Sequence, residues 1–283
     1  MKNYLSLIKF SHTIFALPFA LIGYFLAIEY STFSFDTILL LKVVFCMVFA
    51  RNAAMAFNRY IDRDIDKANE RTAEIREIPN GSIQPKSALI FVIINSVLLI
   101  ATTFFINSIC FYLSPVALIV VLGYSLTKRF TALCHLVLGV GLSLAPIGAY
   151  LAVTGSFAWL PLYFSFAVLF WVAGFDMIYA LQDDAFDKEM GLNSIPAKIG
   201  RKATLNLSVL FHLITAGYLI TAAYQSNAGI LFWIGTMLFL GLLSYQHFIV
   251  KPNDLSKVNL AFFTTNGVAS VVFSVFVILS FYL

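Results

Sequence analysis

The chain has 283 residues, of which 60% are hydrophobic and only 11% are charged, and its mean hydropathy is +0.89. A soluble domain carries about 25% charged residues, so this composition excludes a soluble globular protein and indicates an integral membrane protein. The net charge of +4 is small and gives no sign of a nucleic-acid partner.

Apolar runs of roughly 20 residues, the length that a helix needs to cross a bilayer, recur along the whole chain. We therefore predict a single all-α integral membrane domain over residues 1–283, built as a bundle of nine transmembrane helices with a polar cytoplasmic cap. The spans lie near residues 11–29, 37–57, 87–107, 110–127, 132–153, 158–181, 203–223, 228–249 and 258–281. A signal peptide is the alternative for the first run, but no clear small-residue cleavage site follows it, so we expect a retained helix.

The basic residues lie on one side of this arrangement. Apart from Lys42 and Arg51, which fall inside the second span, every Lys and Arg lies near the N-terminus or in a loop that follows an even-numbered helix. Positive residues mark the cytoplasmic side of a membrane protein. The pattern supports nine helices in the inner cell membrane, with the charged loops in the cytoplasm and the C-terminus outside.

The first charged stretch after an apolar run is Asn58-Arg-Tyr-Ile-Asp62-Arg-Asp-Ile-Asp66. Asn58, Asp62 and Asp66 have i, i+4, i+8 spacing, which places three oxygen-bearing side chains on one face of a helix. An ionised Asp at a membrane boundary is costly and is rarely found there without a partner. Oxygen ligands suit Mg²⁺, which is typically shared with substrate phosphates.

A second acidic stretch ends the sixth span on the same side of the membrane. Asp176, Asp183 and Asp187 have i, i+7, i+11 spacing, again one helical face. Asp183 and Asp187 repeat the spacing of Asp62 and Asp66, which suggests an internal duplication of the regions 58–66 and 176–187. Two such faces that met would hold a diphosphate between metal ions.

Further polar residues are candidates for the same site. Arg51 lies too deep in its span for easy snorkelling, so we expect it to contact a diphosphate or carboxylate. Lys128 lies one turn after Tyr124 and is placed to reach a phosphate, whereas Arg129 beside it is equally well explained as a cytoplasmic anchor. Cys46, Cys110 and Cys134 have no metal-ligand spacing and are expected to be small buried residues. The four histidines also lack such spacing; His135, His212 and His247 are assigned no role, and His12 is left open.

These motifs carry a resemblance that covers nearly the whole chain. The sequence resembles the UbiA superfamily of intramembrane aromatic prenyltransferases, and within it the 4-hydroxybenzoate polyprenyltransferase branch, including relatives that serve a menaquinone route. The matching segments are IKFSHTIFALP at 8–18, NxxxDxxxD at 58–66, RTA at 71–73, YxxxK at 124–128, DxxYxxxDxxxD at 176–187 and SIPxxxG at 194–200. Two positions depart from the family pattern. Arg59 stands where many members have Asp, and the RTAxR spacing is stretched so that Arg76 follows Arg71 by five residues.

The resemblance implies transfer of a polyprenyl group from a polyprenyl diphosphate to an aromatic acceptor such as 4-hydroxybenzoate, within the lipid bilayer. Asn58, Asp62 and Asp66 are then expected to bind one Mg²⁺, and Asp183 with Asp187 a second. The expected diphosphate donors are Arg51, Arg71, Arg76, Tyr124 and Lys128. Asp183 or Asp176 is expected to orient the acceptor or take its proton, with Tyr179 and Gln182 as hydrogen-bonding neighbours.

The sequence alone is also compatible with other functions. The acceptor would instead be a hydroxynaphthoate in menaquinone biosynthesis, or the substrate of another branch of the superfamily, such as haem farnesylation or lipid ether synthesis. A cation-coupled transporter is a different class, but transporters place such groups near the midplane on broken helices. A CDP-alcohol phosphotransferase would need a Gly-containing acidic signature that the sequence lacks.

Overall fold

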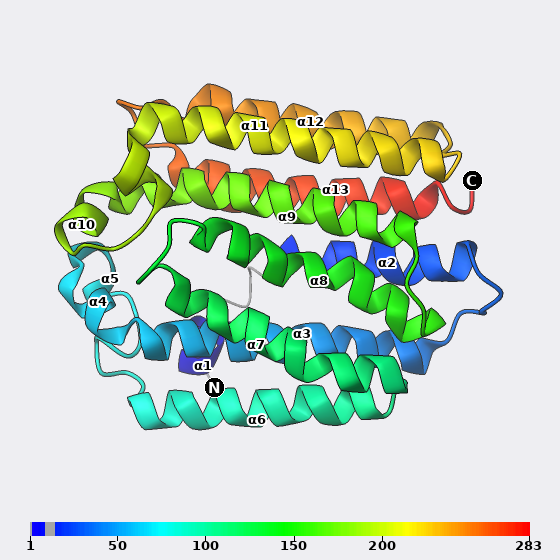
Figure 1. The fold of residues 1–283 in the computed structure, drawn as a ribbon, viewed down its shortest axis with the longest axis horizontal. Coiled ribbons are helices and arrows are strands. Elements are labelled where there is room, and N and C mark those ends of the chain that lie inside the picture. The colour runs from blue at the N-terminus through cyan, green and yellow to red at the C-terminus, as the bar shows by residue number, and fades with distance from the viewer. Residues whose placement is uncertain (1, 9–14) are drawn as a thin grey trace.

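The computed structural model describes residues 2–8 and 15–283, which form a layered bundle of helices that run back and forth along a common direction (Figure 1). Eight helical segments are long and apolar enough to cross a membrane, and a shorter apolar helix, α2, lies among them. In the described part of the chain these match the nine predicted spans. The elements are α1 Lys2–Leu7, α2 Leu17–Glu29, α3 Thr37–Ile61, α4 Arg63–Ala68, α5 Glu70–Ala73, α6 Pro85–Phe104, α7 Ser108–Thr127, α8 Cys134–Thr154, α9 Trp159–Ala180, η2 Leu181–Asp183, α10 Asp184–Glu189, α11 Ile195–Gln225, α12 Ile230–Ile249, η3 Leu260–Thr265 and α13 Asn266–Leu279.

Local sequence explains where several helices begin and end. The Asp36 side chain accepts hydrogen bonds from the backbone N–H groups of Ile38 and Leu39, so it caps the first turn of α3. α11 begins at Ile195, eight residues before the predicted span, because Ser194 caps it through the N–H of Ala197. Gly200 then adopts a φ of +79° and kinks the helix, a conformation that favours glycine.

Small residues allow neighbouring helices to approach closely. A Cβ atom at Gly23 of α2 would lie 2.0 Å from the carbonyl oxygen of Pro146 in α8, and one at Gly139 of α8 would lie 2.4 Å from that of Leu169 in α9. Membrane helices lack a hydrophobic drive to associate with one another, so such close backbone contact is a main source of their packing energy. These glycines fix α8 against both neighbours.

The largest core lies in the half of the bundle formed by α2, α8, α9, α11, α12 and α13. It is rich in aromatic side chains, and Phe19, Trp171 and Phe273 are almost fully buried within it. The Trp171 ring centroid lies 5.3 Å from that of Phe19, and its indole N–H donates to Asn266. An apolar cavity lies beside this packed half, where α3 and α7 face α8.

The short helices α4, α5 and α10 gather at one end of the bundle, at the left of Figure 1. α4 and α5 follow α3 there, and η2 with α10 follows α9, whereas the C-terminus lies at the opposite end. The predicted polar cap is therefore present, and both acidic stretches belong to it.

Candidate active site

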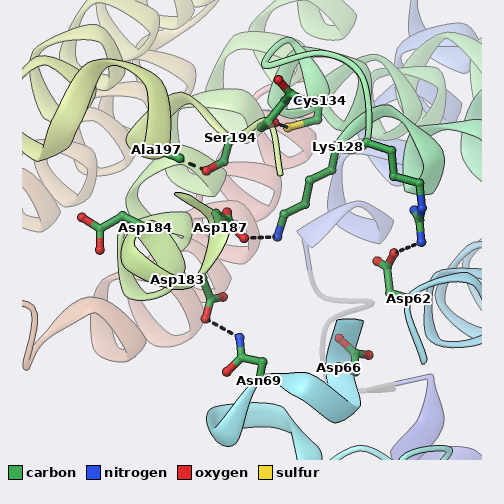
Figure 2. A network of polar contacts seen from close by, with 12 residues as sticks. Asp62, Asp66, Asn69, Lys128, Cys134, Asp183, Asp184, Asp187, Ser194 and Ala197 are labelled. Atoms are coloured by element: carbon green, nitrogen blue, oxygen red, sulfur yellow. Dashed lines mark hydrogen bonds and ion pairs between the residues drawn. The ribbon is translucent and has the colours of Figure 1, made fainter. Parts of the chain in front are cut away.

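A polar cavity of about 260 Å³ opens between this cap and the ends of the long helices. Both acidic stretches line it, although they are more than 100 residues apart in the sequence. Figure 2 shows Asp62, Asp66, Asp183 and Asp187 around a shared space. Of the predicted site residues, those that line the cavity are Arg51, Asn58, Asp62, Asp66, Arg71, Arg76, Tyr124, Lys128, Asp176, Tyr179, Asp183 and Asp187.

The first acidic stretch is not one continuous helix. α3 ends at Ile61, Asp62 caps its C-terminus, and α4 begins at Arg63. The three oxygen-bearing side chains nevertheless face the cavity. The Asn58 amide donates to Asp62 over 2.9 Å, and the opposite carboxylate oxygen of Asp62 lies 2.9 Å from Arg129. Asp66, only 4% exposed, pairs with Arg76.

The second stretch is broken in the same way, by the 3₁₀ turn η2 that carries Asp183. Arg71 from the cap reaches Asp183 with two nitrogens, at 2.9 Å and 2.5 Å, and the Asn69 amide donates to the same carboxylate at 3.0 Å. Asp187 is 1% exposed and lies 2.7 Å from the Lys128 ammonium group. Each of the four carboxylates thus forms an ion pair with a basic residue that lies outside its own acidic stretch.

Asp184 differs from its neighbours in the motif. It points away from the shared space in Figure 2 and pairs with Arg201 at 2.6 Å, outside the lining of the polar cavity. Gln182 does not line the cavity either; its side-chain amide donates to the carbonyl of Tyr179. The acceptor contact predicted for Gln182 therefore has no support from its position, whereas Tyr179 faces the cavity.

The carboxylates fit Mg²⁺ that is shared with a substrate. One oxygen of Asp62, one of Asp66 and both of Asp187 are buried and accept no hydrogen bond from any described residue, although Arg129 and Lys128 lie within ion-pair distance of Asp62 and Asp187. Such oxygens are costly to bury unless they gain a ligand. Mg²⁺ typically binds through one or two carboxylates and takes its other ligands from phosphates and water, and the carboxylates that line this cavity suit that role.

Two further arginines on α3 line the cavity without an ion-pair partner in the described part of the chain. Arg59 is only 7% exposed, and its guanidinium group donates to the side-chain oxygen of Asn58 over 3.3 Å. Nε of Arg59 and Nε of Arg51 are both buried without a hydrogen-bond partner. A buried guanidinium group in this state favours an anionic ligand.

Burial and pairing shift the titration of the groups in the cap. Burial raises the pKa of Asp62 above its ordinary value, and the nearby Arg129 opposes that shift. Burial alone would lower the pKa of Arg71, but its hydrogen bond to Asp183 and the neighbouring Tyr179 outweigh it, so that the pKa of Arg71 is raised. Arg71 therefore remains a cation at any physiological pH.

The structure also brings in residues that sequence reasoning did not select. Arg129 pairs with Asp62, so it does more than anchor the loop. His135 lines the cavity and contacts Asp176 at 2.7 Å, a pairing across 41 residues that no spacing rule connects. Asn69, which donates to Asp183, was not predicted because it lies in a charged loop and belongs to no recognisable motif. His12 lies outside the described residues.

An apolar cavity of about 400 Å³ continues from the polar one along α3, α7 and α8. On α7 its lining extends from Cys110 to Tyr124, which corresponds to about 21 Å of helix. Five residues line both cavities: Arg51, Met55, Tyr124, Leu138 and Leu142. The polar, charged cavity is therefore joined to a long apolar one. Such a pair of cavities suits an amphiphilic ligand with an anionic head and an apolar tail.

The placement of the charges disfavours a transporter. The four paired carboxylates lie at one end of the bundle, beside the cap helices. Coupling-ion sites in transporters lie near the midplane, between the halves of broken helices.

Comparison with known proteins agrees with this geometry. The sequence model of the UbiA prenyltransferase family matches residues 16–268. The 4-hydroxybenzoate octaprenyltransferase of Aliivibrio fischeri is 31% identical over 249 residues, 84% of this chain and 82% of that protein. The corresponding enzyme of Nitrosospira multiformis is 29% identical over 236 residues, 83% of this chain and 81% of the relative.

Solved structures show the same architecture. The apo structure of a UbiA homolog from Aeropyrum pernix K1 has a TM-score of 0.80 and 29% identity, and covers 94% of this chain and 95% of its own. A UbiA homolog from Archaeoglobus fulgidus, bound to GPP and Mg²⁺, has a TM-score of 0.74 at 21% identity and covers 99% of this chain and 100% of its own. The second likeness is evidence for the fold only.

Proposed function

This protein belongs to the UbiA prenyltransferase family, and we propose that it transfers a polyprenyl group from a polyprenyl diphosphate to 4-hydroxybenzoate in quinone biosynthesis. The observation that carries the proposal is the pair of acidic stretches that converge on one polar cavity, which opens into an apolar one. The names of the relatives, 4-hydroxybenzoate octaprenyltransferases, support the choice of acceptor and donor.

The diphosphate head would lie between the two acidic stretches. Asn58, Asp62 and Asp66 would hold one Mg²⁺, and Asp183 with Asp187 the other. When bound there, Mg²⁺ supplies charge neutralisation to the departing diphosphate and orients it. The buried carboxylate oxygens that accept no hydrogen bond from a described residue support this assignment.

The cations that now pair with the carboxylates would also serve the diphosphate. Arg71, Arg76 and Lys128 each hold one of the acidic groups and have further N–H groups to offer. Arg51 and Tyr124 lie where the two cavities join, so they would contact the head on its apolar side. We add Arg59 to this set, because its guanidinium group lines the cavity without a carboxylate partner in the described chain.

The prenyl tail would occupy the apolar cavity. The bond that breaks joins head to tail, so it would lie near the junction lined by Met55, Tyr124 and Leu138. The buried, apolar surroundings would protect the allylic cation from water. Aromatic faces stabilise cations, and the rings of Tyr179 and Phe262, 4.2 Å apart between centroids, both line the polar cavity.

We place the active site on the cytoplasmic side of the inner membrane. The basic loops gather at the end of the bundle that holds the polar cavity, and basic loops remain in the cytoplasm. The head of the donor would then meet the aqueous phase while its tail remains in the bilayer.

The test is product analysis with the purified protein in liposomes. Octaprenyl diphosphate and Mg²⁺ would be supplied with 4-hydroxybenzoate or with 1,4-dihydroxy-2-naphthoate, and products identified by mass spectrometry. A prenylated 4-hydroxybenzoate would support the proposal. If only the naphthoate gave a product, the enzyme would be assigned to menaquinone biosynthesis instead. If neither acceptor gave a product, the proposed aromatic prenyl transfer would be contradicted.

A further inference from the structure

One ionisable pair in the polar cavity has no part in holding the diphosphate. His135, in the first turn of α8, lies with Nδ1 2.7 Å from an oxygen of Asp176 in α9. His135 is 3% exposed, whereas the Asp176 side chain keeps 22% of its surface accessible, and both residues line the cavity. The buried histidine thus supports a carboxylate that faces the cavity.

The backbone of α11 sets the hydrogen position on this histidine. The N–H of Ile195 points at Nε2 of His135 over 3.4 Å, so Nε2 acts as the acceptor and the ring hydrogen belongs on Nδ1. Nδ1–H then donates to Asp176. Ser194, itself buried, fixes this turn by capping α11 through the N–H of Ala197.

Asp176 differs from the other carboxylates of the cavity in what holds it. Asp183 has both oxygens engaged, by Arg71 and Asn69, and Asp187 is matched by Lys128. Asp176 has an imidazole on one oxygen, while its second oxygen has no partner among the residues that the structure describes. A carboxylate with a free oxygen remains a competent proton acceptor, whereas one held by a bidentate guanidinium group is a weaker base.

The position of the pair also suits the acceptor rather than the donor head. Asp176 lies one helical turn before Tyr179 and directly after Phe175, and the rings of Phe175 and Tyr179 both contact Phe262 in the lining of the cavity. His135 lies one turn before Leu138, which lines both cavities. The pair therefore lies between the aromatic lining, which suits an acceptor ring, and the junction where the reacting allylic carbon is proposed to lie.

We propose that Asp176 is the general base that removes the ring proton of the aromatic acceptor, and that His135 is the positioning residue that aims it. The C–O bond of the donor breaks and its electron pair leaves with the diphosphate. The ring carbon beside the hydroxyl forms the new C–C bond with the allylic carbon. The hydrogen on that ring carbon passes as a proton to the free oxygen of Asp176, and the C–H electron pair restores the aromatic ring. The proton later leaves to water at the cavity mouth.

This inference rests on the proposed function, and an isotope effect separates the two. The substrate is 4-hydroxybenzoate deuterated at both carbons that flank the hydroxyl-bearing carbon, and kcat is compared with that of the undeuterated acid. In the wild-type enzyme we expect fast proton removal and a ratio near unity. If the wild-type enzyme forms no product from this acid, the proposed function fails and the assignment of Asp176 fails with it.

We expect Asp176→Asn to lower kcat by about 10²–10⁴-fold, the usual contribution of a general base, and to reveal a primary isotope effect. His135→Leu should lower kcat by about tenfold to a hundredfold, since a hydrogen bond to a charged group is lost, and should show the same isotope effect. His135→Asn retains a donor near the position of Nδ1 and should restore both values. KM for the donor should stay unchanged in all three variants.

If a variant is inactive, a measurement of donor-analogue binding shows whether the loss comes from catalysis or from misfolding. Mg²⁺-dependent binding of a non-reactive thiodiphosphate analogue, unchanged from the wild type, would show that the variant is folded and that its head site is intact. A slow Asp176→Asn enzyme with an isotope effect of unity would overturn the assignment of Asp176 as the base. Equal losses in His135→Leu and His135→Asn would overturn the positioning role of His135.

Discussion

Asp183 and Asp184 are adjacent in sequence but occupy different environments. Asp183 faces the space that the acidic residues share, whereas Asp184 points away from it (Figure 2). Arg71 holds Asp183, and Arg201 pairs with Asp184. A motif written as a row of acids does not separate them. The 3₁₀ turn at Leu181–Asp183 does, because it changes the direction in which successive side chains point.

This pair provides a matched test of the site. We expect Asp183→Asn to lower kcat/KM for the donor at least about a hundredfold, because its contact with Arg71 and its proposed contact with Mg²⁺ are charge-assisted, each worth about 1.5–3 kcal/mol. Asp184→Asn should change it by no more than a few fold, since a partly exposed ion pair is worth about 0–1 kcal/mol. Steady-state transfer assays would measure both. Equal losses in the two variants would contradict the assignment.

Arg59 is one of the two positions at which this chain departs from the family pattern, and it lines the polar cavity. We expect Arg59→Met to raise KM for the prenyl diphosphate about tenfold to a hundredfold, through the loss of one charge-assisted contact. Arg59→Lys should recover part of the affinity, since it keeps the charge but not the planar fork. The matched control is Arg63→Met, which changes a residue that does not line the cavity. A normal KM in Arg59→Met would remove Arg59 from the site.

At the residue scale, the sequence predicted a site residue correctly where burying a charged side chain at that position costs free energy unless it has a partner. Asp62, Asp66, Asp183 and Asp187 were predicted because acids at a membrane boundary need partners, and all four line one cavity. His135 was not predicted, since its partner lies 41 residues away on another helix and histidine is common in helices without any role. Likewise, nothing in the sequence distinguishes an arginine that anchors a loop from one that also binds a carboxylate, as Arg129 does.

At the scale of the elements, both acidic stretches lie across a break between helices. α3 ends at Ile61 and α4 follows, as α9 ends at Ala180 and α10 follows after η2. Sequence reasoning predicted one continuous helical face in each case. Periodicity alone did not reveal the breaks, because no Gly or Pro marks either one. The similarity of the two helix ends is consistent with an internal duplication, which remains a hypothesis.

The packing of α8 against α9 positions Asp176 beside His135, and Gly139 permits it. We expect Gly139→Ala to destabilise the protein by about 1–3 kcal/mol, because the added methyl group would meet the backbone of Leu169. The control is Gly241→Ala in α12, where a Cβ atom meets nothing within 4 Å. Thermal unfolding in detergent would compare the two, and an unchanged transition in Gly139→Ala would refute this packing argument.

At the scale of the whole molecule, the bundle was predictable because composition, span length and charge asymmetry agree. The lipid-facing surface requires apolar helices, and the basic loops order them across the membrane. The cavities were not predictable, since their volume depends on how side chains from α3, α7 and α8 fit together. The length of the prenyl tail was beyond the sequence for the same reason.

The apolar cavity now supports a prediction about tail length. Gly148 lines it, and a Cβ atom added there would enter open space. We expect Gly148→Leu to lower kcat/KM for octaprenyl diphosphate relative to geranyl diphosphate, because the larger side chain would block the distal part of the cavity. Gly217→Leu on α11, outside that lining, should leave the ratio unchanged. Competition assays with both donors would give the ratio, and an unchanged value in Gly148→Leu would place the tail elsewhere.

In the proposed site, two acidic stretches that are distant in sequence together hold one diphosphate through Mg²⁺. Calorimetric binding of geranyl thiodiphosphate to wild type, Asp62→Ala and Asp183→Ala, with Mg²⁺ and with excess EDTA, tests it most directly. We predict tight binding to the wild type with Mg²⁺, and a loss of binding with EDTA or with either substitution alone. Undiminished binding in both variants, or binding that is indifferent to EDTA, would contradict the account.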